Sequence, residues 1–248
     1  MKAFILHFIF ETKSGFRKKQ QLFLNYFFPL GFFLMMGAIM PQLNPLFLDD
    51  MIPAMLIFSV MASTFLGIPD PIVNDRTSGI YRGYRVNRVP SIFLISLPVL
   101  SSVIHMLIMS TVILILSPLL FGAPFPASIL PILPLLLLTV FCCAGISVLI
   151  GVISTSTRAA TMLSQVFFIP SMIIGGLMIP YKMLPPSVQP FALFLPSTHS
   201  MNLFKTFMYQ TEASISPAVS IAVLTGTGTA ALILSLIFFR WDNRKDNS

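Results

Sequence analysis

The chain has 248 residues, of which 56% are hydrophobic and only 9% charged, and its mean hydropathy is +0.89. One globule of this length cannot bury so much apolar surface, so the composition excludes a soluble domain and predicts an all-α polytopic membrane protein. The net charge of +7 does not indicate nucleic-acid binding, because the basic residues gather at the ends of apolar runs. Cys142 and Cys143 are adjacent within one such run, which favours packing over a disulfide or a metal site.

Residues 1–20 are predicted to form an amphipathic helix on the membrane surface. The apolar residues of its first turns fall on one helical face: Phe4, Ile5, Phe8 and Ile9. Charged residues follow from Glu11 onward, and no small-residue cleavage site separates the two parts, which argues against a secretion signal.

Six apolar runs are long enough to span a bilayer, which requires about 20 residues in a helix. They cover about Leu22–Met40, Met51–Pro69, Ile92–Leu116, Ile129–Ile153, Ala159–Ile179 and Pro217–Phe239. We therefore expect one transmembrane permease domain over residues 1–248.

Lys and Arg residues give the expected orientation. With six spans, thirteen of the fifteen basic residues fall on one side of the membrane. Only Lys182 and Lys205 fall on the other side, together with Asp49, Asp50 and Glu212. We expect a multi-pass protein of a bacterial cell membrane with both termini in the cytoplasm.

The predicted spans contain no Asp, Glu, Lys or Arg, and His105 is their only ionisable imidazole. A histidine without an acidic partner favours a neutral hydrogen-bonding role. Ion-coupled carriers commonly keep charges or inverted repeats in the membrane, and neither is found here. The three histidines are expected at different depths, which argues against an enzyme. Because the chain has no P-loop, an energy source for transport is expected on another chain.

Residues 181–212 are predicted to form an outer re-entrant segment. The segment is too apolar for a free loop, and its prolines interrupt any full span. Two short helices are expected, around Ser187–Phe194 and around Thr198–Tyr209, close to the outer end of a pathway. The alternative is an amphipathic loop that lies on the membrane surface.

Residues 74–90 place four arginines between two apolar runs, so this segment is expected in water: Arg76, Arg82, Arg85 and Arg88. The last three are spaced by three residues and are expected on one face of a short helix. Tyr81 and Tyr84 are expected at the headgroup level. Simple positive-inside anchoring explains the arginines but requires neither Gly79 nor Gly83, so docking of a soluble partner is the favoured interpretation.

The pattern Asp75-Arg76, Gly79, Arg82 and Pro90 resembles the cytoplasmic segment between spans two and three of ATP-binding-cassette (ABC) transporter permeases of the type-2 exporter class. Other parts of the chain are similar to the same family in order and spacing. They are Glu11 and Arg17 before a first span with Pro29, then Gly145-Ile146, Gly151, Ala159-Ala160 and Pro170, and finally Gly176, Pro180, Pro185 and Pro196. One departure is Thr77-Ser78, where the family often has an acidic residue before the glycine.

The resemblance implies a six-span subunit that pairs with a second copy, or with a paralogous permease, above two cytoplasmic ABC ATPase subunits. ATP and Mg²⁺ would bind those subunits, and no catalytic, cofactor or metal site is expected on this chain. Segment 70–91 and the N-terminal helix would couple to the ATPase through Glu11, Arg17, Asp75, Arg76, Gly79, Arg82, Gly83, Arg85 and Pro90. An outer gate would contain Gly176, Pro180, Pro185, Pro190 and Pro196.

The substrate class is inferred from composition. The 24 phenylalanines and 15 methionines suit a hydrophobic or amphipathic substrate, such as a drug, a lipid or a peptide antibiotic. Export of a polysaccharide or glycolipid by a permease of the same family is the first alternative, and an ion-coupled carrier is the second.

Overall fold

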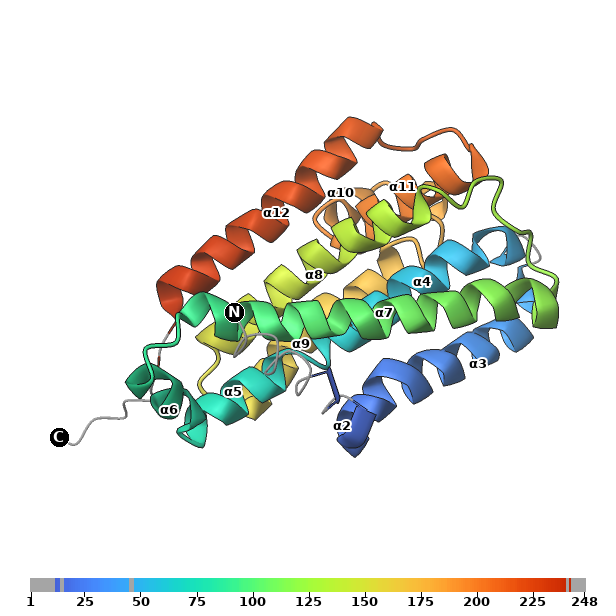
Figure 1. Cartoon of the computed structure of the whole chain (residues 1–248). Helices are drawn as coiled ribbons and strands as arrows, with labels where there is room; N and C mark the ends of the chain where they lie inside the picture. The colour runs from blue at the N-terminus through green and yellow to red at the C-terminus, as the bar shows by residue number, and fades with distance from the viewer. Residues whose placement is uncertain (1–11, 14–15, 45–46, 240, 242–248) are drawn as a thin grey trace.

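The computed structural model describes residues 12–13, 16–44, 47–239 and 241, and within them the regular structure is entirely helical. Six helical stretches are long and apolar enough to cross a membrane (Figure 1): Lys19–Leu43, Phe47–Thr77, Ser91–Phe121, Ile132–Ile153, Thr157–Ile174 and Pro217–Phe238. The predicted all-α fold with six spans is confirmed. Most of the predicted surface helix over residues 1–20, Glu11 included, lies outside the described residues.

Span one is not a uniform α-helix. It begins with α2 (Lys19–Leu22), continues as the π-helix η1 (Phe23–Phe27) and becomes α3 (Phe28–Leu43). A π-helical turn is wider than an α-turn, and such turns occur often at functional sites. Asn25 lies in this turn and is buried against the neighbouring spans.

Span two forms the centre of the bundle. Its main part, α4 (Phe47–Phe65), packs against α3, α7, α8, α9 and α11. After a break at residues 66–68 the chain continues as α5 (Pro69–Thr77). At Gly67 an added Cβ would lie 2.3 Å from the Ser63 carbonyl oxygen, so only glycine fits this break. The helical stretch is longer than the predicted span Met51–Pro69, and its charged residues all lie outside that span: Asp49, Asp50, Asp70, Asp75 and Arg76.

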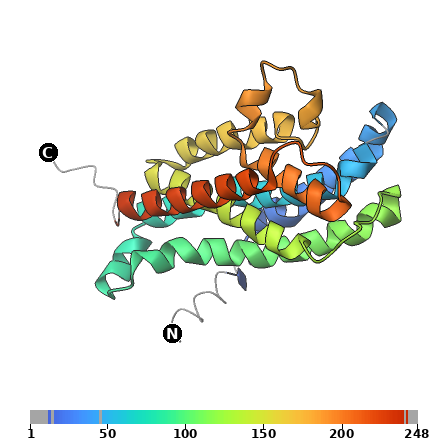
Figure 2. The same cartoon turned by 90° about the horizontal axis from the view of Figure 1, so that it is seen from above.

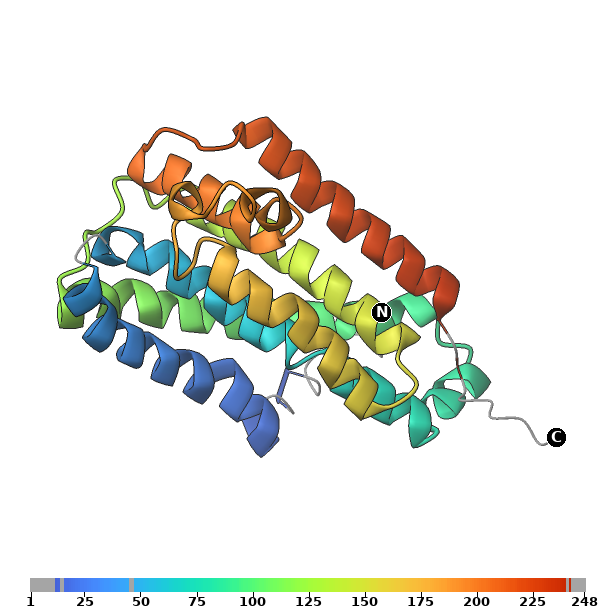
Figure 3. The same ribbon diagram turned by 180° about the vertical axis from the view of Figure 1, so that it is seen from behind.

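The other spans are α7 (Ser91–Phe121), α8 (Ile132–Ile153), α9 (Thr157–Ile174) and α12 (Pro217–Phe238). Figure 3 shows α9 on the face of the bundle opposite to the one in front in Figure 1. Helices α8 and α12 pack closely, because glycines meet at their crossing. A Cβ on Gly145 would lie 2.9 Å from the Gly228 carbonyl oxygen. Small residues allow such close packing of membrane helices.

The bundle has two different ends (Figures 1 and 2). One, here called the α6 end, carries α5, α6 (Ile80–Val86) and the last turn of α12. The other, the α11 end, carries the 3₁₀ turn η2 (Tyr181–Met183), α10 (Gln189–Ala192) and α11 (Pro196–Tyr209). The two short helices predicted between residues 187 and 209 are present as α10 and α11. Helix α11 packs against α4, α8, α9 and α12.

Candidate functional site

The basic segment at the α6 end divides into a buried part and an exposed part. Arg76 lies in α5 and is only 4% exposed. Its Nη1 donates to the Val152 carbonyl oxygen at 2.6 Å, and its Nη2 donates to the Ser154 carbonyl oxygen. These carbonyls stand at the C-terminal end of α8, where helical partners are missing and positive charge is favoured. The prediction that all four arginines lie in water is therefore wrong for Arg76.

Two further contacts hold α5 against its neighbours. The side chain of Ile72 packs on α8 so closely that a Cβ at Gly151 would lie 3.0 Å from it. Thr161, in α9, donates a hydrogen bond from Oγ1 to Asp70 Oδ1 at 3.2 Å. Together with Arg76, these contacts attach α5 to the ends of both α8 and α9.

Helix α6 follows a tight turn and presents two arginines at the surface. Gly79 adopts φ +78°, a conformation that favours glycine, and it precedes the first residue of α6. Arg82 and Arg85 are exposed on α6 and spaced as predicted. Arg88 is also exposed but lies beyond α6 with φ +53°, so the predicted face of three arginines is reduced to two. Nothing lies within 4 Å of a Cβ added at Gly83, so packing does not require glycine there.

The remaining predicted residues of this segment have different positions. Tyr81 is 4% exposed, and its ring lies 5.6 Å from that of Phe239 at the end of α12, so the side chain packs against protein. Pro90 is the N-cap residue of α7. Asp75 is half-buried near the end of α5, and Arg17 is exposed just before span one.

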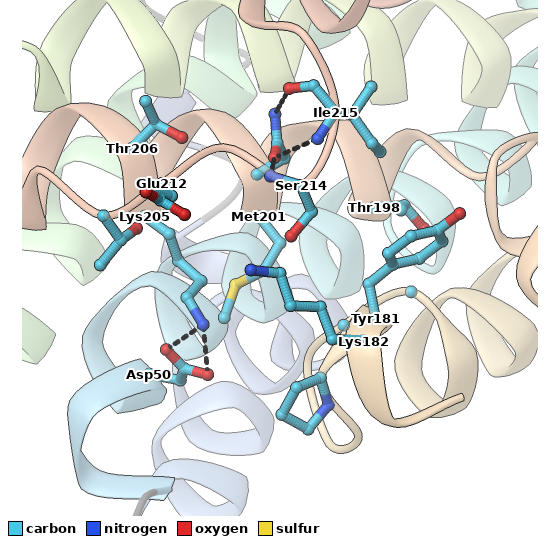
Figure 4. A pocket seen from close by; sticks show the side chains of 15 residues that line it. Asp50, Tyr181, Lys182, Thr198, Met201, Lys205, Thr206, Glu212, Ser214 and Ile215 are labelled. Atoms are coloured by element: carbon cyan, nitrogen blue, oxygen red, sulfur yellow. Dashed lines mark hydrogen bonds and ion pairs between the residues drawn. The ribbon is translucent and has the colours of Figure 1, made fainter. Parts of the chain in front are cut away.

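A polar pocket lies at the α11 end (Figure 4). It has a volume of about 190 Å³ and lies between α4, the end of α9, and α11. The Lys205 ammonium lies 2.7 Å from Asp50 Oδ1 and 2.8 Å from Oδ2, and this ion pair joins α11 to α4. Lys182 and Glu212 line the same pocket. Four of the five charged residues that were expected on one side of the membrane thus line one pocket at this end of the bundle.

Two of the five predicted gate residues line this pocket, namely Gly176 and Pro180. Gly176 has φ +90°, and an added Cβ would lie 3.2 Å from Met201 Cγ. The other three shape the chain nearby. The Pro185 carbonyl accepts hydrogen bonds from two backbone amides of the following turn, while Pro190 and Pro196 lie at the N-terminal ends of α10 and α11.

Two buried polar residues of α11 were missed by the sequence analysis. The Asn202 amide donates to the Ile215 carbonyl at 2.8 Å and accepts from the amides of Ser214 and Ile215. His199 Nε2 donates to the Leu193 carbonyl at 2.9 Å, which leaves Nδ1 to accept from Ser220 at 3.2 Å. Burial lowers the pKa of His199, against a smaller opposing effect of the bond to Leu193. His199 and Asn202 are three residues apart, which places them on one face of a short helix, and this spacing was the sequence signal that could have revealed them.

A side-chain hydrogen bond joins α8, the helix that Arg76 contacts at the α6 end, to α11 at the opposite end of the bundle. The Thr139 hydroxyl in α8 donates to the Leu135 carbonyl of its own helix at 2.8 Å, so it accepts from the Ser200 hydroxyl in α11, which lies 3.0 Å away. Both hydroxyls are fully buried. The other end of α8 is the one held by Arg76. Helix α8 therefore contacts the α5 segment at one end and the α11 segment at the other.

Six membrane-length helices, with a basic exposed helix at one end and a polar pocket at the other, define a multi-pass membrane protein with two chemically different ends. The sequence model of the ABC-2 type transporter family matches residues 3–209, and the chain belongs to this family. It is a membrane permease of an ABC transporter, and family membership implies association with an ABC ATPase. The predicted family is confirmed. A search of curated proteins finds no significant match.

Proposed function

We propose that the chain is the membrane subunit of an exporter that moves a hydrophobic or amphipathic substrate outward. ATP hydrolysis would take place on a separate cytoplasmic ATPase, which would hold ATP and Mg²⁺. The observation that supports the proposal most is the division of the basic segment into a buried part and an exposed part. Arg82 and Arg85 are exposed on α6, whereas the adjoining α5 is fixed in the bundle by Arg76. An exposed basic helix, joined to a helix that is bonded to the bundle, suits the docking of a partner that transmits force.

The contacts of α8 supply a path for that force. A displacement of α6 would move α5, and the bonds of Arg76 would pass it to α8. Helix α8 is bonded through Thr139 to Ser200 of α11, beside the polar pocket. ATP-driven closure of the ATPase pair would therefore change the packing at the opposite end of the bundle.

The orientation proposed for the subunit follows from charge. The α6 end would face the cytoplasm because it carries most of the basic residues, and both termini would lie there. The α11 end would face outward, with α10 and α11 as a re-entrant segment and the polar pocket as an outer gate. The packing of α11 against four helices supports this role, because irregular backbone at membrane depth must be covered by protein.

The proposed substrate is a drug, a lipid or a peptide antibiotic, because the 24 phenylalanines and 15 methionines of the chain suit an apolar or amphipathic molecule. Glycolipid export is the second candidate, because the pocket at the α11 end is lined by hydroxyl and amide groups: Thr198, Asn202, Thr206, Thr211 and Ser214. Such groups suit a hydroxyl-rich headgroup. Pairing with a second copy, or with a paralogous permease, would complete the membrane part.

Two experiments test the proposal. Single cysteines at Arg88 and Glu212 should react differently with an impermeant maleimide, with Glu212→Cys labelled in intact cells and Arg88→Cys only after lysis. The reverse pattern would overturn the orientation. Proteoliposomes that contain the permease and its ATPase should move a labelled amphipathic lipid or drug in an ATP-dependent manner. Stable assembly without movement of either probe would contradict the proposed substrate class.

A further inference from the structure

A small polar chamber lies between spans one, two and three, towards the α6 end. Its volume is about 30 Å³, and its polar lining comes from Gln21, Asn25, Ser63, Ser101, Ser102 and His105. These residues belong to three separate helical stretches, namely α2 with η1, then α4, and α7. A polar cluster is unusual inside spans that are otherwise strongly apolar.

Three polar atoms of this chamber have no hydrogen-bond partner within the part of the chain that the structure describes: Gln21 Oε1, Ser63 Oγ and His105 Nε2. Ser63 and His105 are each only 2% exposed. A buried polar atom without a partner costs about 1–3 kcal/mol, so three in one small space call for a shared ligand.

His105 is held so that one ring nitrogen is left for this ligand. The Tyr26 hydroxyl is hydrogen bonded to Nδ1 at 2.7 Å, and Phe16 lies against the ring with a centroid distance of 4.8 Å. Nε2 is therefore the nitrogen available to the chamber. Depending on the tautomer it donates or accepts, and a water molecule can do either.

Irregular backbone from all three spans surrounds the chamber. The π-helix η1 contributes Asn25, and the break between α4 and α5 contributes Gly67. Pro98 contributes from inside α7, where a proline removes one helical hydrogen bond. Backbone groups released in this way need polar partners when they lie at membrane depth.

A wider groove lies next to the chamber. It has a volume of about 390 Å³ and runs between residues 18–24 and α5. The groove and the chamber share Gln21, Gly67 and Pro71 in their linings. The groove also carries charges of both signs, from Lys18, Lys19, Asp70 and Asp75. Such a lining is easily hydrated.

We propose that the chamber is a binding site for ordered water, which the groove supplies from the α6 end. A water molecule requires roughly 10–15 Å³ of this kind of volume and two to four polar partners, so the chamber would hold about two. The uncharged oxygen and nitrogen groups of its lining match water in both donor and acceptor capacity.

The consequence is a hydrated joint between α4 and α5. Water molecules can exchange hydrogen-bond partners as the break at Gly67 bends, whereas a dry apolar contact resists such motion. Helix α5 could then follow a displacement of α6 while α4 stays in the core. This mechanical role rests on the proposed function, but the water site itself does not.

Hydroxyl-radical footprinting by brief radiolysis tests the site on the purified full-length permease without an ATPase. Radicals formed from bound water oxidise neighbouring side chains, even buried ones. His199 is the internal control, because it is also 2% exposed but both of its ring nitrogens are hydrogen bonded within the protein. We expect His105 to be oxidised several-fold faster than His199. Equal rates would overturn the proposal.

A matched pair of variants tests whether the fast oxidation of His105 depends on the chamber. Ser63→Val fills part of the chamber and removes one polar partner, so His105 oxidation should fall several-fold. Ser59→Val, one turn earlier on α4, removes a buried hydroxyl that is bonded to Leu56 of its own helix, and it should leave the rate unchanged. If Ser63→Val does not insert, water-edited solid-state NMR of the histidine-labelled protein decides. Magnetisation must be transferred from water to His105 faster than to His199, and equal transfer rates would contradict the site.

Discussion

Arg76 Nη1 donates to the carbonyl oxygen of Val152 at 2.6 Å, and this bond joins residues that are 76 positions apart in the chain. The bond gives one arginine of the basic segment a structural role, while Arg82 and Arg85 remain exposed on α6. Stability and partner binding should therefore respond to different arginines of the same short segment.

Replacing Arg76 by methionine should destabilise the protein. The methionine side chain has most of the length of arginine but donates no hydrogen bonds, so the carbonyls of Val152 and Ser154 lose their buried partner. We expect a loss of about 2–4 kcal/mol, measured by thermal or denaturant unfolding in detergent. Arg82→Met, at an exposed position, is the control and should unfold almost as the unmodified protein does. Equal losses in the two variants would contradict the structural role of Arg76.

The close contact of α8 and α12 gives a second prediction. A Cβ at Gly228 would lie 2.7 Å from the Phe141 ring and 3.1 Å from Cys142 Cα, so Gly228→Val should cost about 1–3 kcal/mol. Gly226 lies in the same helix with nothing within 4 Å of an added Cβ. Thermal unfolding of Gly226→Val should therefore differ little from that of the unmodified chain. If the two valines had the same effect, this packing of α8 on α12 would be wrong.

His199 should make stability depend on pH. Burial lowers its pKa below the ordinary value of 6.5, so the unfolded chain binds a proton more readily than the folded one as the pH falls. Its contribution to stability is therefore present above about pH 6.5 and declines below it. Unfolding temperatures measured between about pH 8 and pH 5.5 should fall more for the unmodified protein than for His199→Gln. Parallel pH curves would show that His199 is not the group responsible.

The hydrogen bond between α8 and α11 should matter for transport rather than for assembly. Thr139→Val keeps the shape of the side chain but removes the bond to Ser200, together with a bond to Leu135 within its own helix. We expect normal recovery of the ATPase and a reduced rate of ATP-dependent transport. Ser147→Ala is the control, since the Ser147 hydroxyl is bonded to Cys143 in its own helix. Unchanged transport by Thr139→Val would exclude this path for the force.

The spans could be predicted from the sequence because the length of an apolar run is a local property. The two short helices near residues 187–209 could also be predicted, because Pro190 and Pro196 mark where they begin. The burial of Arg76 could not be predicted. Its partners are backbone carbonyls at the end of a distant helix, and no sequence pattern reveals which helix end an arginine will meet.

The chamber around His105 could not be predicted from the sequence either. The lack of an acidic partner in the sequence favours a neutral hydrogen-bonding role for His105, and its bond to Tyr26 agrees with that role. Asn25 and Ser63 were not singled out, because an isolated polar residue in an apolar run usually bonds to its own helix. Only the packing of three spans brings these residues to one place.

The most direct test of the account is recovery of the ATPase with a permease whose α6 charges are reversed. Arg82→Glu combined with Arg85→Glu should insert into the membrane and unfold like the unmodified protein, since both side chains are exposed. Lys182→Glu, a charge reversal at the α11 end, is the control. After gentle detergent extraction, we expect the ATPase to co-purify with the control but not with the double variant. Undiminished recovery of the ATPase, together with undiminished transport, would contradict the assignment of α6 as the docking helix.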